Sequence, residues 1–187
     1  MKPIQSKQKI EEVNEIYDKV STANQEYFKI WKEDTLFHWD FWVSLLFTLL
    51  PIIFWIRFRK KESSNRLLFS GMFVFIISSW LDFLGVQLGK WYYTGKVIPT
   101  IPSYVPWDWF ILPVFVMTLI QIKPRLSPFL KSLIFAGVNT WIGEPLFLWF
   151  GFYVMTDWHI YYSFPIYVII YLIAHKLSKV TNFEPLT

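Results

Sequence analysis

The sequence contains no cysteine among its 187 residues, so disulfides, thiolate metal sites and cysteine nucleophiles are excluded. Charged residues are scarce, at 17%, whereas apolar residues make up 54% and aromatic residues 21%. A soluble domain of this size rarely carries 11 tryptophans and 19 phenylalanines, but a bilayer protein places such side chains at its interfaces. The composition therefore indicates a membrane protein.

The net charge of +4 does not indicate a nucleic-acid surface. Residues 1–39 hold six lysines against seven acidic residues, and the basic surplus lies in short clusters between apolar runs. This pattern is typical of membrane topology signals. The chain also lacks a phosphate-binding glycine loop, a G-x-S-x-G motif and a metalloprotease helix motif. We therefore expect no nucleic-acid partner, no cofactor and no metal.

Five apolar segments follow the polar N-terminal region, at residues 41–58, 67–89, 103–122, 132–152 and 161–175. A helix rises about 1.5 Å per residue, so about 20 residues cross the hydrocarbon core of a bilayer. The first and fifth segments are short, and interfacial aromatic and basic residues absorb the mismatch. The predicted fold class is an all-α polytopic membrane helix bundle with five transmembrane helices. The predicted transmembrane domain covers residues 40–179, and residues 180–187 form a cytoplasmic tail.

Lysine and arginine residues predict the orientation of this bundle. Ten of them fall in loops on one side: Arg57, Arg59, Lys60, Lys61, Arg66, Lys123, Arg125, Lys131, Lys176 and Lys179. The loops on the other side carry only Lys90 and Lys96. By the positive-inside rule, the first side is cytoplasmic. The sequence thus predicts a multi-pass protein of the cell membrane, with an extracytoplasmic N-terminus and a cytoplasmic C-terminus.

The N-terminal region, residues 1–39, is predicted to be an extracytoplasmic helical segment. Within residues 8–33, apolar side chains recur at spacings of three, four and seven: Ile10, Val13, Tyr17, Val20, Tyr27 and Trp31. This periodicity predicts an amphipathic helix. Its apolar stripe either lies on the membrane surface, packs on the bundle or binds a protein partner.

Two parts of the chain share a spacing pattern. Residues 82–91 and 144–153 each begin with an acidic residue, have glycine seven positions later and an aromatic residue nine positions later. Each is followed by a loop and by a helix that starts near a proline, Pro106 or Pro165. Two helices per unit is an even number, so the two copies have the same orientation. The predicted bundle is one leading helix followed by two parallel two-helix repeats.

This repeat resembles that of the small bacterial lycopene cyclases, over roughly residues 66–175. The matching positions are Asp82, Gly89, Trp91, Pro106 and Asp108. The resemblance implies an intramembrane protein whose carboxylates act on the end group of a carotenoid or another isoprenoid. Two positions differ from the family pattern. Tyr167 stands where the second unit would have its acid, and Trp109 follows Asp108 where the family usually has a second acid.

The whole chain is similar to an uncharacterised family of small multipass membrane proteins from spore-forming Gram-positive bacteria. The similarity includes the N-terminal helix and the start of the first span at His38, Trp39 and Asp40. It implies no established activity.

Ionisable residues inside membrane spans are costly and are therefore functional candidates. By helical rise, Asp82 lies about 24 Å and Glu144 about 20 Å from the cytoplasmic ends of their helices, in the outer half. Asp40 and Asp108 begin the first and third helices from that side. The catalytic candidates are Asp82, Asp108 and Glu144. The wider predicted ligand-binding group comprises Asp40, Asp82, Trp91, Asp108, Asn139, Glu144 and Tyr167.

The same carboxyl groups also have structural interpretations. Asp40 and Asp108 stand where helices begin, so they are interpreted as helix caps that do not preclude a function. Asp82 and Glu144 lie inside helices, where a carboxyl group either joins helices through hydrogen bonds or serves a ligand, a proton or a reaction.

Three hypotheses about function follow. The lack of catalytic motifs and the stripe on residues 8–33 favour a non-enzymatic structural or partner-binding component. The alternative is a lycopene-cyclase-like enzyme or binder of an isoprenoid or other lipid that uses the outer-half carboxylates. A third hypothesis is a small proton- or cation-coupled transporter.

Overall fold

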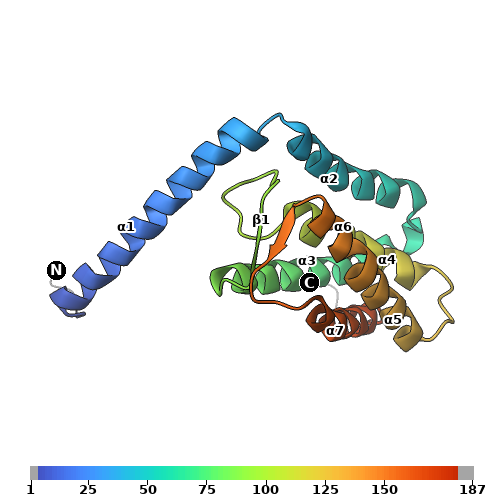
Figure 1. Cartoon of the computed structure of the whole chain (residues 1–187). Helices are drawn as coiled ribbons and strands as arrows, with labels where there is room; N and C mark the ends of the chain where they lie inside the picture. The colour runs from blue at the N-terminus through green and yellow to red at the C-terminus, as the bar shows by residue number, and fades with distance from the viewer. Residues whose placement is uncertain (1–3, 181–187) are drawn as a thin grey trace, which may run out of the picture.

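The computed structural model describes residues 4–180, and most of them are helical (Figure 1). The α-helices are α1 (Lys7–Ile30), α2 (Trp39–Phe58), α3 (Ser64–Gln87), α4 (Leu112–Gln121), α5 (Pro128–Val138), α6 (Glu144–Trp149) and α7 (Ser163–Leu177). The other helical segments are the π-helices η1 (Trp31–Thr35), η3 (Pro106–Ile111) and η4 (Asn139–Gly143) and the 3₁₀ turns η2 (Lys61–Ser63) and η5 (Ile160–Tyr162). The predicted tail lies outside the described residues, apart from Val180.

Each of the five apolar segments is helical. Among residues 4–180, three helical stretches are long and apolar enough to cross a membrane: Trp39–Phe58, Lys61–Gln87 and Ile160–Leu177. Pro106–Gln121 is a shorter apolar helix, and α5, η4 and α6 follow one another without a break from residue 128 to residue 149. The chain is thus a helical protein with segments suited to a membrane.

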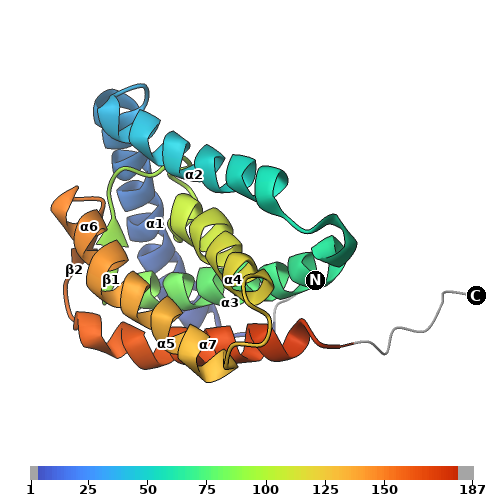
Figure 2. The ribbon, with the colours of Figure 1, turned by 90° about the vertical axis from the view of Figure 1, so that its right-hand side faces the viewer.

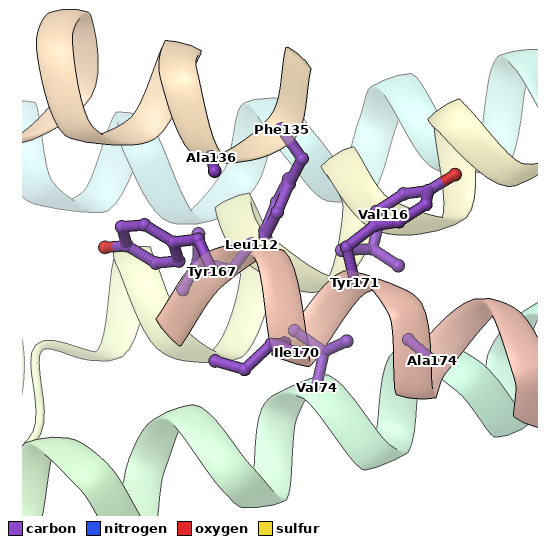
Figure 3. Packing of buried hydrophobic residues seen from close by; sticks show 9 residues of the cluster. All are labelled: Val74, Leu112, Val116, Phe135, Ala136, Tyr167, Ile170, Tyr171 and Ala174. Atoms are coloured by element: carbon purple, nitrogen blue, oxygen red, sulfur yellow. The ribbon is translucent and has the colours of Figure 1, made fainter. Parts of the chain in front are cut away.

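The main core joins α7 to three other helices (Figure 3). It consists of Val74 from α3, Leu112 and Val116 from α4, Phe135 and Ala136 from α5, and Tyr167, Ile170, Tyr171 and Ala174 from α7. Phe135 lies between the rings of Tyr167 and Tyr171, with ring centres 5.7 and 5.8 Å away. Small side chains such as Ala136 and Ala174 let the helices approach closely.

A short β-ribbon covers one end of the bundle, which we call the ribbon end (Figure 2). Strand β1 (Trp91–Tyr93) pairs antiparallel with β2 (Tyr153–Met155), and Tyr92 lies opposite Val154. The all-α prediction lacked this element. Two strands of three residues each form only when the loops that carry them meet, so neither segment shows the ribbon by itself.

The hydrogen bonds around the ribbon are related by an approximate, local two-fold symmetry. Each of the two helices that lead into it, α3 and α6, is followed two residues later by a glycine with positive φ, 66° at Gly89 and 74° at Gly151. The hydroxyl of Thr94 donates to the Gly151 carbonyl oxygen at 2.6 Å, and the hydroxyl of Thr156 donates to the Gly89 carbonyl oxygen at 2.5 Å. Equivalent positions of the two similar segments therefore make equivalent bonds to each other.

Helix α1 extends away from the bundle (Figures 1 and 2). Among the described residues, hydrogen bonds to the bundle come from its C-terminal end and from the start of η1: the Tyr27 hydroxyl donates to the Thr94 carbonyl oxygen at 3.3 Å, and the Trp31 indole N–H donates to the Lys96 carbonyl oxygen at 2.7 Å. In the described chain, no residue of α1 itself is buried. The last two residues of the predicted stripe thus pack on the bundle, whereas Tyr17 and Val20 stay exposed beside an open hollow that Thr100 also lines.

Candidate functional site

Asp82 is the centre of a hydrogen-bond network below the ribbon. Its Oδ1 atom accepts the Trp91 indole N–H at 3.0 Å and the Tyr93 hydroxyl at 2.7 Å, and its Oδ2 atom accepts the Tyr104 backbone N–H at 3.1 Å. Three donors satisfy a buried carboxylate better than a neutral carboxyl group. Asp82 therefore acts as a fixed hydrogen-bond acceptor, held by the loops on both sides of it.

Close packing against α3 positions the Trp91 indole. Gly85 lies one turn after Asp82, and a Cβ atom on it would be only 1.9 Å from Cζ2 of Trp91. The ring also packs edge-on against Trp158, with centres 4.9 Å apart. The glycine thus leaves room for the ring that donates to Asp82.

Asp108 faces Asp82 from η3. Its side chain is only 3% exposed and adjoins the Asp82 carboxyl group. Within residues 4–180, its Oδ2 atom has no hydrogen-bond partner. The Ser78 hydroxyl donates to the Asp108 backbone carbonyl oxygen at 3.1 Å and so joins α3 to η3. π-Helical turns such as η3 are frequent at functional sites.

Glu144 approaches the same region from the other side, directly after the π-helix η4. Its side chain interacts with Ser163 and Tyr167, which come from α7. Its Oε2 atom is buried and has no hydrogen-bond partner in the described part of the chain. The Tyr167 hydroxyl in turn accepts the Trp107 indole N–H at 3.3 Å. Glu144 and Tyr167 thus form a second polar pair, opposite Asp82 and Asp108.

These two pairs line one cavity of about 280 Å³ at the ribbon end. The remaining walls are mostly apolar or aromatic and include Leu81, Leu112, Phe147, Ile166 and Ile170. Near the ribbon, the walls include Leu88, which is 70% exposed, and Lys90, which pairs with Asp157. The cavity therefore combines an apolar wall with three buried carboxyl groups.

Five of the seven predicted ligand-binding residues line this cavity: Asp82, Trp91, Asp108, Glu144 and Tyr167. Asp40 and Asn139 lie outside it. Asp40 has a buried oxygen without a hydrogen-bond partner among the described residues, and its Cβ lies beside Gly95. The Asn139 amide donates to the Phe135 carbonyl oxygen at 2.7 Å, which is a contact within its own helix.

The capping interpretation of Asp40 and Asp108 is wrong in its detail. The residue before α2 is His38 and the residue before η3 is Val105, and neither helix start has a side-chain cap in the described chain. Both aspartates lie instead in the first helical turn, at the positive end of the helix dipole.

Sequence reasoning missed the tyrosines that complete the site. Tyr93 holds Asp82 and stacks on Tyr104 with ring centres 5.2 Å apart, and Tyr153 packs on the other face of Tyr93. The Tyr104 hydroxyl shares a 2.6 Å hydrogen bond with the Ser44 hydroxyl and so links the site to α2. The only signal was that Tyr93 and Tyr153 follow the repeated glycines, which also matches interfacial aromatic residues.

In residues 4–180, no three His, Asp or Glu side chains gather as ligands for a metal ion. Comparison with known protein families, with curated proteins and with solved structures gives no match to the chain.

Proposed function

We propose that this integral membrane protein binds one end of a long apolar molecule, of the isoprenoid or a related lipid class, in the cavity at the ribbon end. One observation carries the proposal: Asp82, Asp108 and Glu144 line the same largely apolar cavity. Carboxyl groups that only joined helices would sit in separate helix contacts. A volume of about 280 Å³ suits a single end group, because pockets for whole drug-sized ligands span about 300–1,000 Å³.

The carboxyl groups give this cavity acid–base chemistry. Asp82 is held as an acceptor by three donors. Two adjoining carboxyl groups repel each other when both are charged, so such a pair can share one proton. Asp82 already accepts three donors, whereas Oδ2 of Asp108 has no hydrogen-bond partner among the described residues, so Asp108 is the member of the pair that is free to carry a proton. Asp108 would then be a general acid toward a double bond or a polar end group of the ligand. Glu144 would supply the second carboxyl group on the opposite wall.

The matched hydrogen bonds at Gly89 and Gly151 support the proposed parallel repeat, because they join equivalent positions of the two units. In this layout the protein has five spans, with its N-terminus and its ribbon end outside the cell and its C-terminus in the cytoplasm. The basic loop residues support this orientation. The resemblance to the lycopene cyclase repeat supports an isoprenoid rather than a two-chain lipid.

Mass spectrometry of lipids that co-purify with the protein tests this proposal. We expect an enriched isoprenoid or other single-chain species in the wild-type protein. Its amount should fall in Asp82→Asn and Glu144→Gln and should stay unchanged in the matched control Asp40→Asn, whose carboxyl group lies outside the cavity. If the bound lipids simply match the bulk membrane, or if all three variants retain the same species, the cavity is not a lipid site.

The free face of α1 favours a second candidate function, a component that binds another protein. This function does not compete with the first, because α1 and the cavity use different residues.

A further inference from the structure

We propose that α1 pairs with α1 of a second copy of this chain as a parallel, two-stranded coiled coil. The inference goes beyond the proposed cavity function and does not depend on it. It rests on the heptad pattern of α1, the distribution of its charges and the exposure of its apolar face.

Residues 10–31 follow a heptad repeat, in which positions a and d face a partner helix. Position a is taken by Ile10, Tyr17, Asn24 and Trp31, and position d by Val13, Val20 and Tyr27. Tyr27 and Trp31 contact the bundle. The free part, Ile10, Val13, Tyr17, Val20 and Asn24, is called here the α1 seam. It spans two heptads in the part of α1 that extends away from the bundle (Figure 1).

The α1 seam is exposed apart from Ile10, which is half-buried. Tyr17 is 68% exposed and Val20 47%, and the neighbouring Ile16, at position g, is also exposed. In the described part of the chain, α1 buries none of its residues although it is 24 residues long. In proteins, most of the stability of a helix comes from packing of its apolar face against a partner. We therefore expect a partner to pack along the α1 seam.

The charges on α1 favour an identical helix as that partner. Between residues 10 and 30, the charged residues are Glu11, Glu12, Glu15, Asp18, Lys19, Glu26 and Lys29, and all occupy positions b, c or f, away from the seam. The flanking e and g positions hold uncharged residues, among them Asn14, Ser21 and Ala23. Two copies can therefore approach along the seam without like charges meeting.

The same charges argue against the membrane surface as the partner. Helices that lie on a bilayer usually carry lysine and arginine on the polar face, which attract anionic lipids. Helix α1 as a whole instead carries five acidic residues and four lysines, Lys7, Lys9, Lys19 and Lys29. The helix therefore has no basic surplus that would attract anionic headgroups.

The membrane sets the direction of the pair. Two copies in one bilayer have the same orientation, so their α1 helices leave the same face and run parallel. In a parallel pair, each a residue meets the same residue of the other copy. Asn24 would then meet Asn24 of the second copy, and a single buried asparagine at position a favours two strands in one register.

Disulfide cross-linking of single-cysteine variants tests the coiled coil, and the natural absence of cysteine makes the experiment clean. The full-length protein would be placed in lipid vesicles and oxidised. We expect Val13→Cys and Val20→Cys, at position d, to give a covalent dimer in several-fold higher yield than Glu15→Cys and Thr22→Cys, at position f. Adding Tyr17→Glu to Val13→Cys should abolish the dimer, whereas adding Thr22→Glu should leave it unchanged.

Three outcomes would overturn the proposal. Equal yields at all four positions would indicate random collision. An absence of dimer together with free labelling of position 20 by a water-soluble maleimide would show a helix without a partner. An absence of dimer with protection of positions 13 and 20 from the same maleimide would show that lipid or a different protein covers the seam.

Discussion

Replacing Gly85 by alanine should displace the Trp91 indole and open the network around Asp82. The new Cβ atom would lie 1.9 Å from Cζ2, 2.2 Å from Cη2 and 2.4 Å from Cε2 of the indole. The ring cannot simply rotate away, because Trp158 packs against it and its N–H is bound to Asp82 at 3.0 Å. The indole must therefore leave its place or the helix must shift.

The structure sets the size of the effect. Overpacking of a well-filled site costs about 1–3 kcal/mol. A lost hydrogen bond to a charged acceptor adds about 1.5–3 kcal/mol. The higher helix propensity of alanine offsets about 1 kcal/mol of this cost, so Gly85→Ala should lower the free energy of unfolding by about 1.5–5 kcal/mol. The measurement is unfolding of the purified protein in detergent, followed by tryptophan fluorescence. Gly137→Ala is the matched control, because its Cβ would come no closer than 3.3 Å to the Trp141 ring. A gain in helix propensity of about 1 kcal/mol offsets that contact.

A double-mutant cycle separates the clash from other causes. Trp91→Ala removes the ring that Gly85→Ala would strike, so adding Gly85→Ala to Trp91→Ala should cost little more. If Gly85→Ala is as harmful without the indole as with it, the reasoning from ring packing is refuted. It is also refuted if Gly85→Ala leaves stability unchanged.

Three further predictions concern groups at the ribbon end and in the loops. Burial and, secondarily, the charge of Asp40 raise the pKa of Tyr27 to about 12. The neutral Tyr27 phenol therefore stabilises the fold fully below about pH 10, and this contribution is lost as the pH rises from about 10 to 12. The difference between the absorbance titrations of the wild type and Tyr27→Phe should show a step near pH 12. The Lys90 ammonium lowers the pKa of Asp157, so their ion pair stabilises the ribbon at pH values above the ordinary pKa of aspartate. This stabilisation is lost as the pH falls through the lowered pKa. The melting temperatures of the wild type and Asp157→Asn should therefore converge in acid, and a difference that stays constant with pH would contradict this. In intact cells, a membrane-impermeant maleimide should label Asp157→Cys but not Glu62→Cys, and the reverse result would invert the proposed orientation.

The helices were predictable because they depend on local sequence. The apolar segment 41–58 became α2 at Trp39–Phe58, and segment 161–175 became η5 and α7 at Ile160–Leu177. Apolar length and flanking polar residues determine where such a helix begins and ends. The ribbon was not predictable in this way, because Trp91 and Met155 form a pair only after two distant loops meet.

The site was predictable in part for a related reason. Asp82 and Glu144 stood out because an acid inside an apolar helix is costly and needs a partner. Asp40 was placed in the same group because its depth in the bundle was similar, and Asn139 because it could bond to a buried carboxyl group across the bundle. Depth alone does not say which way a side chain faces, and a helix that is apolar all round gives no such direction. Asn139 bonds to its own helix instead.

The differences between the two halves of the cavity carry a consequence for any ligand. The matched hydrogen bonds relate the ribbon ends of the two proposed units, and Asp82 and Glu144 stand at the same place in the shared spacing pattern. Their partners differ, however, because Asp82 adjoins a second carboxyl group, Asp108, whereas Glu144 adjoins the phenol of Tyr167. One wall can therefore supply a proton shared between two acids, and the other a single acid beside a hydroxyl group. If the two walls of the cavity were identical, an end group could bind in two equivalent orientations. Because the two walls differ, one orientation of the end group is favoured. In the proposed site, the reacting end of the ligand would thus point toward Asp82 and Asp108.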